Sequence, residues 1–178
     1  MPNTGLKKEV DFGAIEILVL DVDGVLTDGT VSIHSDGSES KGFSIIDGHG
    51  IKLWHRSGLK TALLSGRASG ATDVRAAQLE ITNIVQGAKK KLPAFEQLLG
   101  ELGLETHQAV YVGDDLLDIP PVRRAGLGVA VANAVDELKE QADYVTLRQG
   151  GSGAVREVIE LVLKSTGRWD ALMERYLV

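Results

Sequence analysis

Two carboxylates, Asp21 and Asp23, lie two positions apart directly after a short apolar run. A second acidic cluster, Gly113 to Asp118 (GDDLLD), follows another apolar run. Carboxylates at the ends of adjacent strands can converge on a hard cation that takes oxygen ligands, for which Mg²⁺ is the natural choice. A plain loop would also contain the first pair, so the prediction of a Mg²⁺ site depends on both clusters.

This pattern suits phosphoryl transfer, because a cation offsets the repulsion between carboxylates and a phosphate dianion. The reaction also needs donors for the phosphoryl oxygens. Ser65 and Gly66 offer a hydroxyl and an unhindered backbone N–H at the end of a predicted strand. A lysine within Lys89 to Lys91 would add positive charge at a helix start. Taken alone, that lysine run is more typical of a solvated charged turn.

Short apolar runs that end at polar clusters indicate buried strands, and longer stretches between them indicate helices. The predicted strands are Ile15 to Leu20, Lys60 to Leu64, Ala109 to Val112 and Gly128 to Val131. The predicted helices are about Gly50 to Ser57, Ser69 to Leu79, Lys91 to Leu102, Ile119 to Ala125 and Val135 to Gln141. Their alternation predicts an α/β fold with a doubly wound, mainly parallel sheet, whose ligands bind at the carboxyl ends of the strands.

Two stretches interrupt this alternation. Gly29 to Phe43 contains a turn signal between two polar-alternating runs and predicts a projecting β-hairpin. Arg148 to Gly153 is rich in glycine and predicts a hinge before a final helix from about Ala154 to Leu163, followed by an amphipathic tail. We expect one domain over 1–178, with a core of about 12–164 and a tail of 165–178.

Composition excludes several classes of protein. The formal charge of −6 comes without a dense Lys/Arg stripe, so nucleic acid is a poor candidate partner. The lack of cysteine excludes disulfides, thiolate metal sites and cysteine nucleophiles. Met1 to Asp11 does not have the pattern of a signal peptide, and no segment approaches the roughly 20 apolar residues of a membrane span. These features predict a soluble cytoplasmic protein with no membrane partner.

Four ordered motifs resemble those of the haloacid dehalogenase-like superfamily, each at a predicted strand end or helix start. They are Asp21 to Thr27 (DVDGVLT), Leu63 to Arg67 (LLSGR), Lys91, and Gly113 to Asp118 (GDDLLD). The resemblance implies a Rossmann-like fold and Mg²⁺ as cofactor. It implies that Asp21 is the nucleophile that forms an aspartyl phosphate, while Asp23 protonates the leaving group and then activates water. An acid at the Asp23 position is shared by phosphatases and phosphomutases of the superfamily.

The resemblance also implies roles for the other polar residues of the motifs. Asp21, the backbone carbonyl of Asp23, and Asp114 would ligate Mg²⁺. Asp115 and Asp118 would support these ligands. The residues that would bind the phosphoryl group are Ser65, Gly66 and Lys91.

The spacing of the motifs leaves no room for a cap domain. The interval from Asp21 to Ser65 is used by the hairpin and one helix, and the interval from Lys91 to Asp114 by one helix and one strand. A mutase must shield its phosphorylated intermediate from water. A capless member is therefore expected to be a hydrolase, which closes its site by oligomerising.

From Ile15 to about Leu163 the chain resembles, more narrowly, the 3-deoxy-D-manno-octulosonate 8-phosphate phosphatases. Residues outside the four motifs support this, namely Asp28-Gly29, Asp47 to Gly50, Gln86-Gly87, Ala142 to Thr146 and Gly150 to Glu157. The resemblance implies a phosphomonoester hydrolase of lipopolysaccharide precursor synthesis. It also implies a capless homotetramer, in which the hairpins form a central barrel and a neighbour's tail reaches the active site.

Two arginines bear on the choice of substrate. Arg75 lies on a predicted helix, where an arginine is usually solvated, but by resemblance it matches the arginine that meets the sugar-acid carboxylate. Arg67 matches the octulosonate branch, whereas phosphatases of nonulosonate (acylneuraminate-type) 9-phosphates tend to carry Glu there. That substrate remains an alternative, and so does a noncatalytic scaffold or regulatory domain. The tail could cover a neighbouring site or pack on its own subunit.

Overall fold

The computed structural model describes residues 5–178, which form a six-stranded sheet flanked by helices. The strands are β1 (Ile17–Leu20), β4 (Lys60–Leu64), β5 (Asn83–Val85), β6 (Ala109–Gly113), β7 (Leu127–Ala130) and β8 (Tyr144–Val145). They lie in the order β5-β4-β1-β6-β7-β8, and every neighbouring pair is parallel. The predicted doubly wound α/β fold is confirmed.

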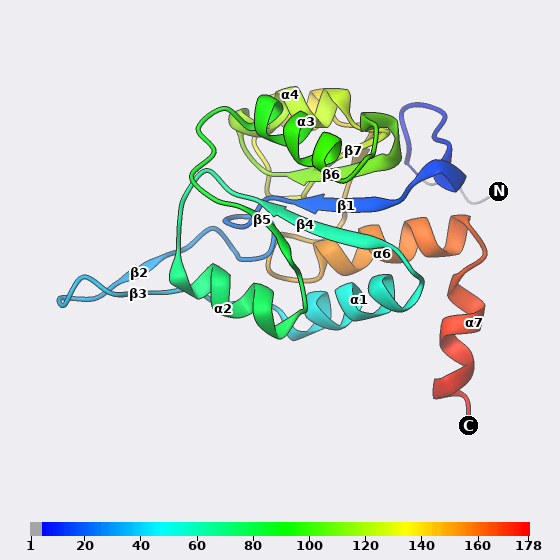
Figure 1. Cartoon of the computed structure of the whole chain (residues 1–178), viewed down its shortest axis with the longest axis horizontal. Coiled ribbons are helices and arrows are strands. Elements are labelled where there is room, and N and C mark those ends of the chain that lie inside the picture. Colours follow the sequence, from blue (N-terminus) through cyan, green and yellow to red (C-terminus); the bar gives the residue numbers. More distant parts are fainter. Residues whose placement is uncertain (1–4) are drawn as a thin grey trace.

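Helices cover both faces of the sheet (Figure 1). One face carries α1 (Ile45–Arg56), α2 (Gly70–Gln78) and α6 (Ala154–Ser165), and the other carries α3 (Lys91–Glu101) and α4 (Ile119–Arg124). The short α5 (Asp136–Gln141) contacts α4 and β7. Single 3-10 turns complete the chain, namely η1 (Phe12–Ala14), η2 (Thr106–Gln108), η3 (Leu116–Asp118) and η4 (Glu174–Tyr176). Within residues 5–178, no helix combines the length and the apolar character needed to cross a bilayer.

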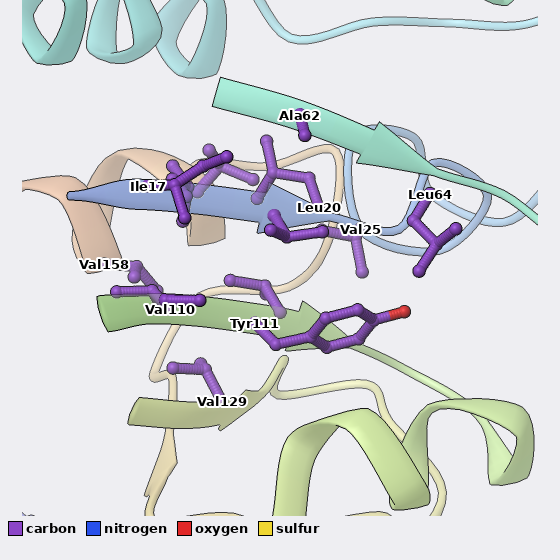
Figure 2. Close-up of a cluster of buried hydrophobic side chains, with 14 of the residues drawn as sticks. Ile17, Leu20, Val25, Ala62, Leu64, Val110, Tyr111, Val129 and Val158 are labelled. Carbon is purple, nitrogen blue, oxygen red and sulfur yellow. The ribbon is translucent and has the colours of Figure 1, made fainter. Parts of the chain in front are cut away.

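The core lies around the central strands, because β1, β6 and β7 are buried along their whole length. Figure 2 shows aliphatic side chains of these strands meeting Val158 of α6 on one side. Burial of each large aliphatic side chain stabilises the fold by roughly 1.5–3 kcal/mol. Tyr111 is also buried among these aliphatic side chains but carries a polar group, a hydroxyl that points towards the carboxyl end of β6.

The first helix starts earlier than predicted. The Ser44 hydroxyl accepts a hydrogen bond from the Asp47 N–H (3.2 Å) and caps α1, so the helix begins at Ile45 and not near Gly50. Glycine is unfavourable inside a helix, so Gly48 argued against a helical first turn in the sequence. Packing explains why glycine stands there, because a Cβ on Gly48 would lie 2.4 Å from an Arg75 guanidinium nitrogen.

The edge strands β5 and β8 were not predicted. Both are short and only half-buried, so neither has the continuous apolar run of a central parallel strand. The first strand also begins later than predicted, because Ile15 ends η1 and the sheet ladder starts at Ile17. The other three predicted strands are within one residue of the observed bounds.

The segment between β1 and α1 forms the predicted hairpin. Its antiparallel strands, β2 (Ser32–Ile33) and β3 (Glu39–Ser40), project away from the body of the molecule (Figure 1). Asp36 closes the turn by accepting hydrogen bonds from the backbone N–H and the hydroxyl of Ser38. The intervals from residue 21 to 65 and from 91 to 114 hold no other domain, as the motif spacing predicted.

The glycine-rich segment seats the last part of the chain on the loop that follows β1. The Gly151 N–H donates to the Val25 carbonyl (2.9 Å), and a Cβ on Gly150 would lie 1.7 Å from the Gly24 carbonyl oxygen. The following helix α6 is packed into the core of its own subunit against α1. The tail that follows contains α7 (Trp169–Met173) and η4, and the partly buried Trp169, Leu172 and Met173 of α7 pack against the core of the same subunit.

Candidate active site

The carboxyl end of β1 holds Asp21 at the floor of a cavity. The Asp21 N–H donates to the Val112 carbonyl of β6 (3.0 Å), which extends the sheet ladder to this residue. One side-chain oxygen, Oδ1, accepts from the Val22 N–H (2.7 Å), and the other, Oδ2, lies 2.8 Å from the Lys91 ammonium. Asp21 is 6% exposed. The core therefore fixes the carboxylate in one orientation.

Asp118 lies behind this pair and receives four donors. Its Oδ1 accepts from the Lys91 ammonium (2.7 Å) and the Tyr111 hydroxyl (2.8 Å). Its Oδ2 accepts from the N–H groups of Asp114 (3.1 Å) and Asp115 (3.2 Å). Asp118 is fully buried, so it holds the lysine and shapes the loop after β6. This geometry agrees with the supporting role expected of it.

Lys91 is the buried member of the lysine run, whereas Lys89 and Lys90 are exposed. It begins α3 and points its ammonium between Asp21 and Asp118. Burial opposes the charged form of Lys91, but the two carboxylates more than offset this and raise its pKa above the usual value. The lysine therefore stays charged beside Asp21.

Asp114 completes an acidic group with Asp21 and Asp118, in which one carboxylate oxygen of each lies within 4.8 Å of the others. Burial and the neighbouring carboxylates raise the pKa of both Asp21 and Asp114. A divalent cation would relieve this repulsion. Each oxygen of Asp118 already accepts from two donors, so Asp118 has no lone pair left for a cation. Each oxygen of Asp21 has one partner, and within the described residues Asp114 Oδ1 has no hydrogen bond, so these two residues can still offer lone pairs to the cation. The oxygen donors fit Mg²⁺.

Gly24 makes the close approach of these loops possible. Its φ of 91° lies in the left-handed region, and a Cβ there would fall 2.0 Å from Asp114 Oδ2. A side chain at residue 24 would push the Asp114 carboxylate away from Asp21. The glycine of the first motif therefore serves the second acidic cluster.

The cavity at this edge has a volume of about 250 Å³. Its lining contains most of the predicted site residues, together with Gly29 and Leu117. Ser65 is buried, and its Oγ accepts from the Arg67 N–H (3.2 Å). The predicted residues that line the cavity are Asp21, Asp23, Ser65, Gly66, Arg67, Lys91, Asp114 and Asp115.

Asp23 faces the cavity from the turn after β1 and meets two cations. The Lys41 ammonium lies 2.7 Å from its Oδ1, and the Arg67 guanidinium lies 4.0 Å from its Oδ2. Arg67 also donates to Glu39 (3.0 Å), which in turn accepts from the Ser69 hydroxyl. The base of the hairpin is thus linked to the active site by a chain of charges.

Arg75 lies outside this cavity. Its guanidinium donates to the Ser44 carbonyl (3.0 Å) and lies 5.7 Å from the centre of the Phe43 ring. It lines a second, more open concavity with Glu39 and Phe43. Glu39, the partner of Arg67, lines this second concavity and so connects it with the first, whose lining does not include Arg75.

Three site residues were not found in the sequence analysis. Glu39 and Lys41 are two positions apart at the end of the hairpin, and the alternation of an extended strand puts both on the face that meets the site. Tyr111 stands in an otherwise apolar strand, two residues before Gly113. Each carried a signal, namely charge alternation for the first two and one polar side chain in a buried run for the third.

The parallel α/β fold and the polar residues at the carboxyl edge of its sheet are those of one class of enzymes. The chain belongs to the haloacid dehalogenase-like hydrolases, whose family profile matches residues 60–159. Within that class it belongs to the 3-deoxy-D-manno-octulosonate 8-phosphate phosphatase family, as the following relatives show. The family predicted from the motifs is confirmed.

The phosphatase KdsC of Escherichia coli (strain K12), named for this substrate, is 45% identical over 156 residues, which are 88% of this chain and 83% of that protein. The phosphatase structure from Moraxella catarrhalis, in complex with a magnesium ion, a phosphate ion and a KDO molecule, has a TM-score of 0.91 at 41% identity and covers 93% of this chain and 95% of that one. The Yersinia pestis structure has a TM-score of 0.87 at 40% identity, covering 89% and 86%.

Proposed function

We propose that this chain hydrolyses 3-deoxy-D-manno-octulosonate 8-phosphate with Mg²⁺, releasing the free sugar acid and phosphate for lipopolysaccharide precursor synthesis. The observation that carries the proposal is the group formed by the buried Asp21, Lys91 and Asp118 with the half-buried Asp114 at the carboxyl ends of β1 and β6. It stands in a chain that is 45% identical to a phosphatase named for this substrate. Arg67, which by resemblance matches the octulosonate rather than the nonulosonate branch, lines the cavity.

Asp21 attacks the phosphorus with a carboxylate oxygen, and the bond from phosphorus to the sugar oxygen breaks. Asp23 gives its proton to that sugar oxygen, which leaves as an alcohol. Asp23 then accepts a proton from water, whose oxygen attacks the phosphorus of the aspartyl phosphate and restores the Asp21 carboxylate. These proton transfers are worth about 10²–10⁴-fold in rate.

The remaining residues stabilise the phosphoryl group during its transfer. Lys91 and the Ser65 hydroxyl, with the Gly66 N–H, would hold its oxygens. Asp21, the Asp23 carbonyl and Asp114 would hold Mg²⁺, with Asp115 and Asp118 supporting them. When bound, the cation neutralises charge that develops on the phosphoryl oxygens.

The sugar acid extends beyond the first cavity, which at about 250 Å³ is smaller than the usual small-molecule site. Arg67 stands at this cavity and Arg75 at the adjoining concavity, where each would offer a bidentate partner to a carboxylate. We assign substrate binding to both and the carboxylate contact to Arg75. Reaching it requires Arg75 to leave Ser44, or a substrate held partly by a neighbouring subunit.

We further propose a homotetramer built on the hairpin, in the cytoplasm, with the tail covering a neighbouring site. Exposed apolar side chains on the hairpin and at the start of α1 support an assembly, because Ile33 is 68% exposed and Ile45 is 83% exposed. A sedimentation experiment tests it. A monomer that stays fully selective for the sugar-acid phosphate would contradict the assembly.

The function is tested by phosphate release from a panel of phosphate esters. The panel contains 3-deoxy-D-manno-octulosonate 8-phosphate, a nonulosonate 9-phosphate and a simple sugar phosphate. We expect the first to have the highest kcat/KM, activity to vanish in excess chelator, and added Mg²⁺ to restore it. Full activity in chelator would contradict the metal, preference for the nonulosonate would contradict the substrate, and no phosphate release from any ester would indicate a scaffold.

A further inference from the structure

We propose that Lys41 is a positioning residue that holds the Asp23 carboxylate where it can protonate the leaving group. The proposal rests on the role of Asp23 in the proposed function. It adds a part of the chain that none of the superfamily motifs contains, the end of the projecting hairpin. Lys41 would thus make the hairpin a working part of the same subunit's active site.

The geometry pairs the two residues closely. The Lys41 ammonium lies 2.7 Å from Asp23 Oδ1, and the side chain of Lys41 has 0% exposure. Glu39, two residues earlier, is the other carboxylate within ion-pair distance, at 3.9 Å. Lys41 immediately follows β3 (Glu39–Ser40), so the returning end of the hairpin lies beside the turn that contains Asp23.

The energetics require the pairing. An ammonium without water is costly unless a carboxylate lies beside it, and breaking a buried pair by removing one partner leaves an uncompensated charge. Lys41 does not line the cavity that holds Asp21 and Lys91. It therefore acts on the reaction through Asp23 and not through the phosphoryl group.

The contact restrains Asp23 without using up its proton-transfer capacity. Within residues 5–178, neither Asp23 oxygen has a well-aligned hydrogen-bond partner, although Lys41 lies beside Oδ1 and Arg67 is 4.0 Å from Oδ2. Asp21, in contrast, is hydrogen-bonded to the Val22 N–H and paired with Lys91. The nucleophile is fixed by hydrogen bonds, whereas the acid is held by charge alone and keeps its lone pairs.

The nature of the leaving group separates this role from all others. A sugar alkoxide is a strong base and needs a proton as the bond breaks, whereas p-nitrophenolate is a stable anion that leaves without one. Misplacing Asp23 must therefore slow release of the sugar from its phosphate and spare release of p-nitrophenol, whereas the later attack of water on the aspartyl phosphate is common to both esters and is slowed alike. A lysine that bound the phosphoryl group would affect both esters.

The experiment measures, with Mg²⁺ and the full-length protein, KM and the single-turnover rate at which the leaving group is released from each ester, a step that precedes the attack of water. We expect Lys41→Met to lower this rate for the sugar phosphate by about 10–100-fold with little change in KM, since part of the general-acid contribution is lost. The rate of p-nitrophenol release should change by less than about threefold. Lys41→Arg should restore much of the loss because it keeps a cation near Asp23.

Two further variants make the result specific. Lys52→Met is the matched control, because Lys52 of α1 pairs with Glu80 (3.1 Å) and lines neither concavity of the site, so both activities should stay at the wild-type level. Asp23→Asn should show the same dependence of leaving-group release on the ester, more strongly. If Asp23→Asn slowed leaving-group release from both esters equally, the proposed role of Asp23 as the acid would be wrong and the role of Lys41 with it.

If Asp23→Asn is selective and Lys41→Met is not, only the role of Lys41 is wrong. An equal loss on both esters, or a rise in KM alone, would overturn it as well. Circular dichroism identifies a variant that does not fold. In that case Lys41→Gln, which keeps most of the side-chain length, undergoes the same comparison with the same outcomes.

Discussion

The inner and outer halves of the active site are built in different ways. The inner half, at the ends of β1 and β6, consists of buried side chains with hydrogen bonds to one another, such as Asp21, Lys91 and Asp118. The outer half comes from the hairpin, the loop after β4, and α2. There Arg67 has a half-exposed side chain, and Arg75 donates to a backbone carbonyl and to the exposed Gln78 side chain of its own helix.

The difference separates chemistry from recognition. A buried network has one low-energy arrangement, which suits a nucleophile that must point at one phosphorus atom. Exposed arginines keep rotameric freedom and can adapt to a sugar acid or to a neighbouring subunit. Changes to the inner half should therefore affect every substrate, and changes to the outer half should affect substrates selectively.

The largest effect is expected from Asp21→Asn. An amide cannot attack the phosphorus, so kcat should fall by about 10⁴-fold or more on every ester, the scale on which nucleophile removal acts. The fold should persist, because Lys91 keeps its bond to Asp118. Phosphate release and thermal unfolding measure the two effects, with the exposed Asp136→Asn as the control. Wild-type turnover in Asp21→Asn would rule out the covalent mechanism.

Asp118→Asn should combine a loss of activity with a loss of stability. The amide has one acceptor where the carboxylate has two, and its NH₂ group would face Tyr111 and Lys91 or two backbone N–H groups. Breaking a buried charged pair costs about 3–5 kcal/mol of unfolding free energy. Denaturant unfolding measures this, and Asp136→Asn should change stability by less than about 0.5 kcal/mol. An unchanged midpoint would show that the network is not structural.

The same division explains what could be predicted from the sequence. Central strands were found because burial on both faces leaves continuous apolar runs, as in Ile17 to Leu20. The edge strands β5 and β8 are half-buried and lack that signature. The start of α1 was missed because glycines that serve tertiary contacts oppose helix propensity. The local sequence pattern therefore fails to predict an element where contacts with a neighbouring element determine its position or its start.

For the site, the motif residues at strand ends were predicted and lie together around one cavity. Lys41 was not predicted, because its partner Asp23 is distant in sequence. Tyr111 was not predicted either, because only the fold brings its hydroxyl to Asp118. The position of Arg75 relative to the cavity could not be derived either, since it depends on how α2 packs against the Ser44 segment. The assigned roles of these residues stay predictions until the variants are measured.

Arg75→Lys tests the outer half. Lysine cannot reproduce the bidentate contact of a guanidinium with a carboxylate. We expect kcat/KM for 3-deoxy-D-manno-octulosonate 8-phosphate to fall about 10- to 30-fold, while a phosphate ester without a carboxylate is spared, corresponding to the loss of about one charge-assisted hydrogen bond. Lys52→Met again provides the control. An equal loss on both substrates would refute the assigned role.

The smallest effect concerns the tail, which is attached on the side of the molecule away from the hairpin (Figure 1). The Tyr176 hydroxyl lies 3.0 Å from His49 Nε2 and accepts from Arg56 (2.9 Å). Partial burial, with the charges of Arg156, Arg56 and Arg175, lowers the pKa of His49. Arg175 and the Tyr176 ring that lies against His49 belong to the tail, so release of the tail removes part of this effect and the docked state binds a proton less readily than the released state.

It follows that tail docking is fully supported above the ordinary histidine pKa of about 6.5 and weakens as the pH falls below it. Hydrogen exchange across residues 169–178, corrected for the intrinsic effect of pH, should show protection that falls about two- to fivefold between about pH 7.5 and pH 5.5. His49→Gln keeps a hydrogen-bonding side chain without a titrating ring and should abolish this dependence. If protection in the wild-type protein did not change with pH, or if His49→Gln kept the same dependence, then His49 would not control the docking of the tail.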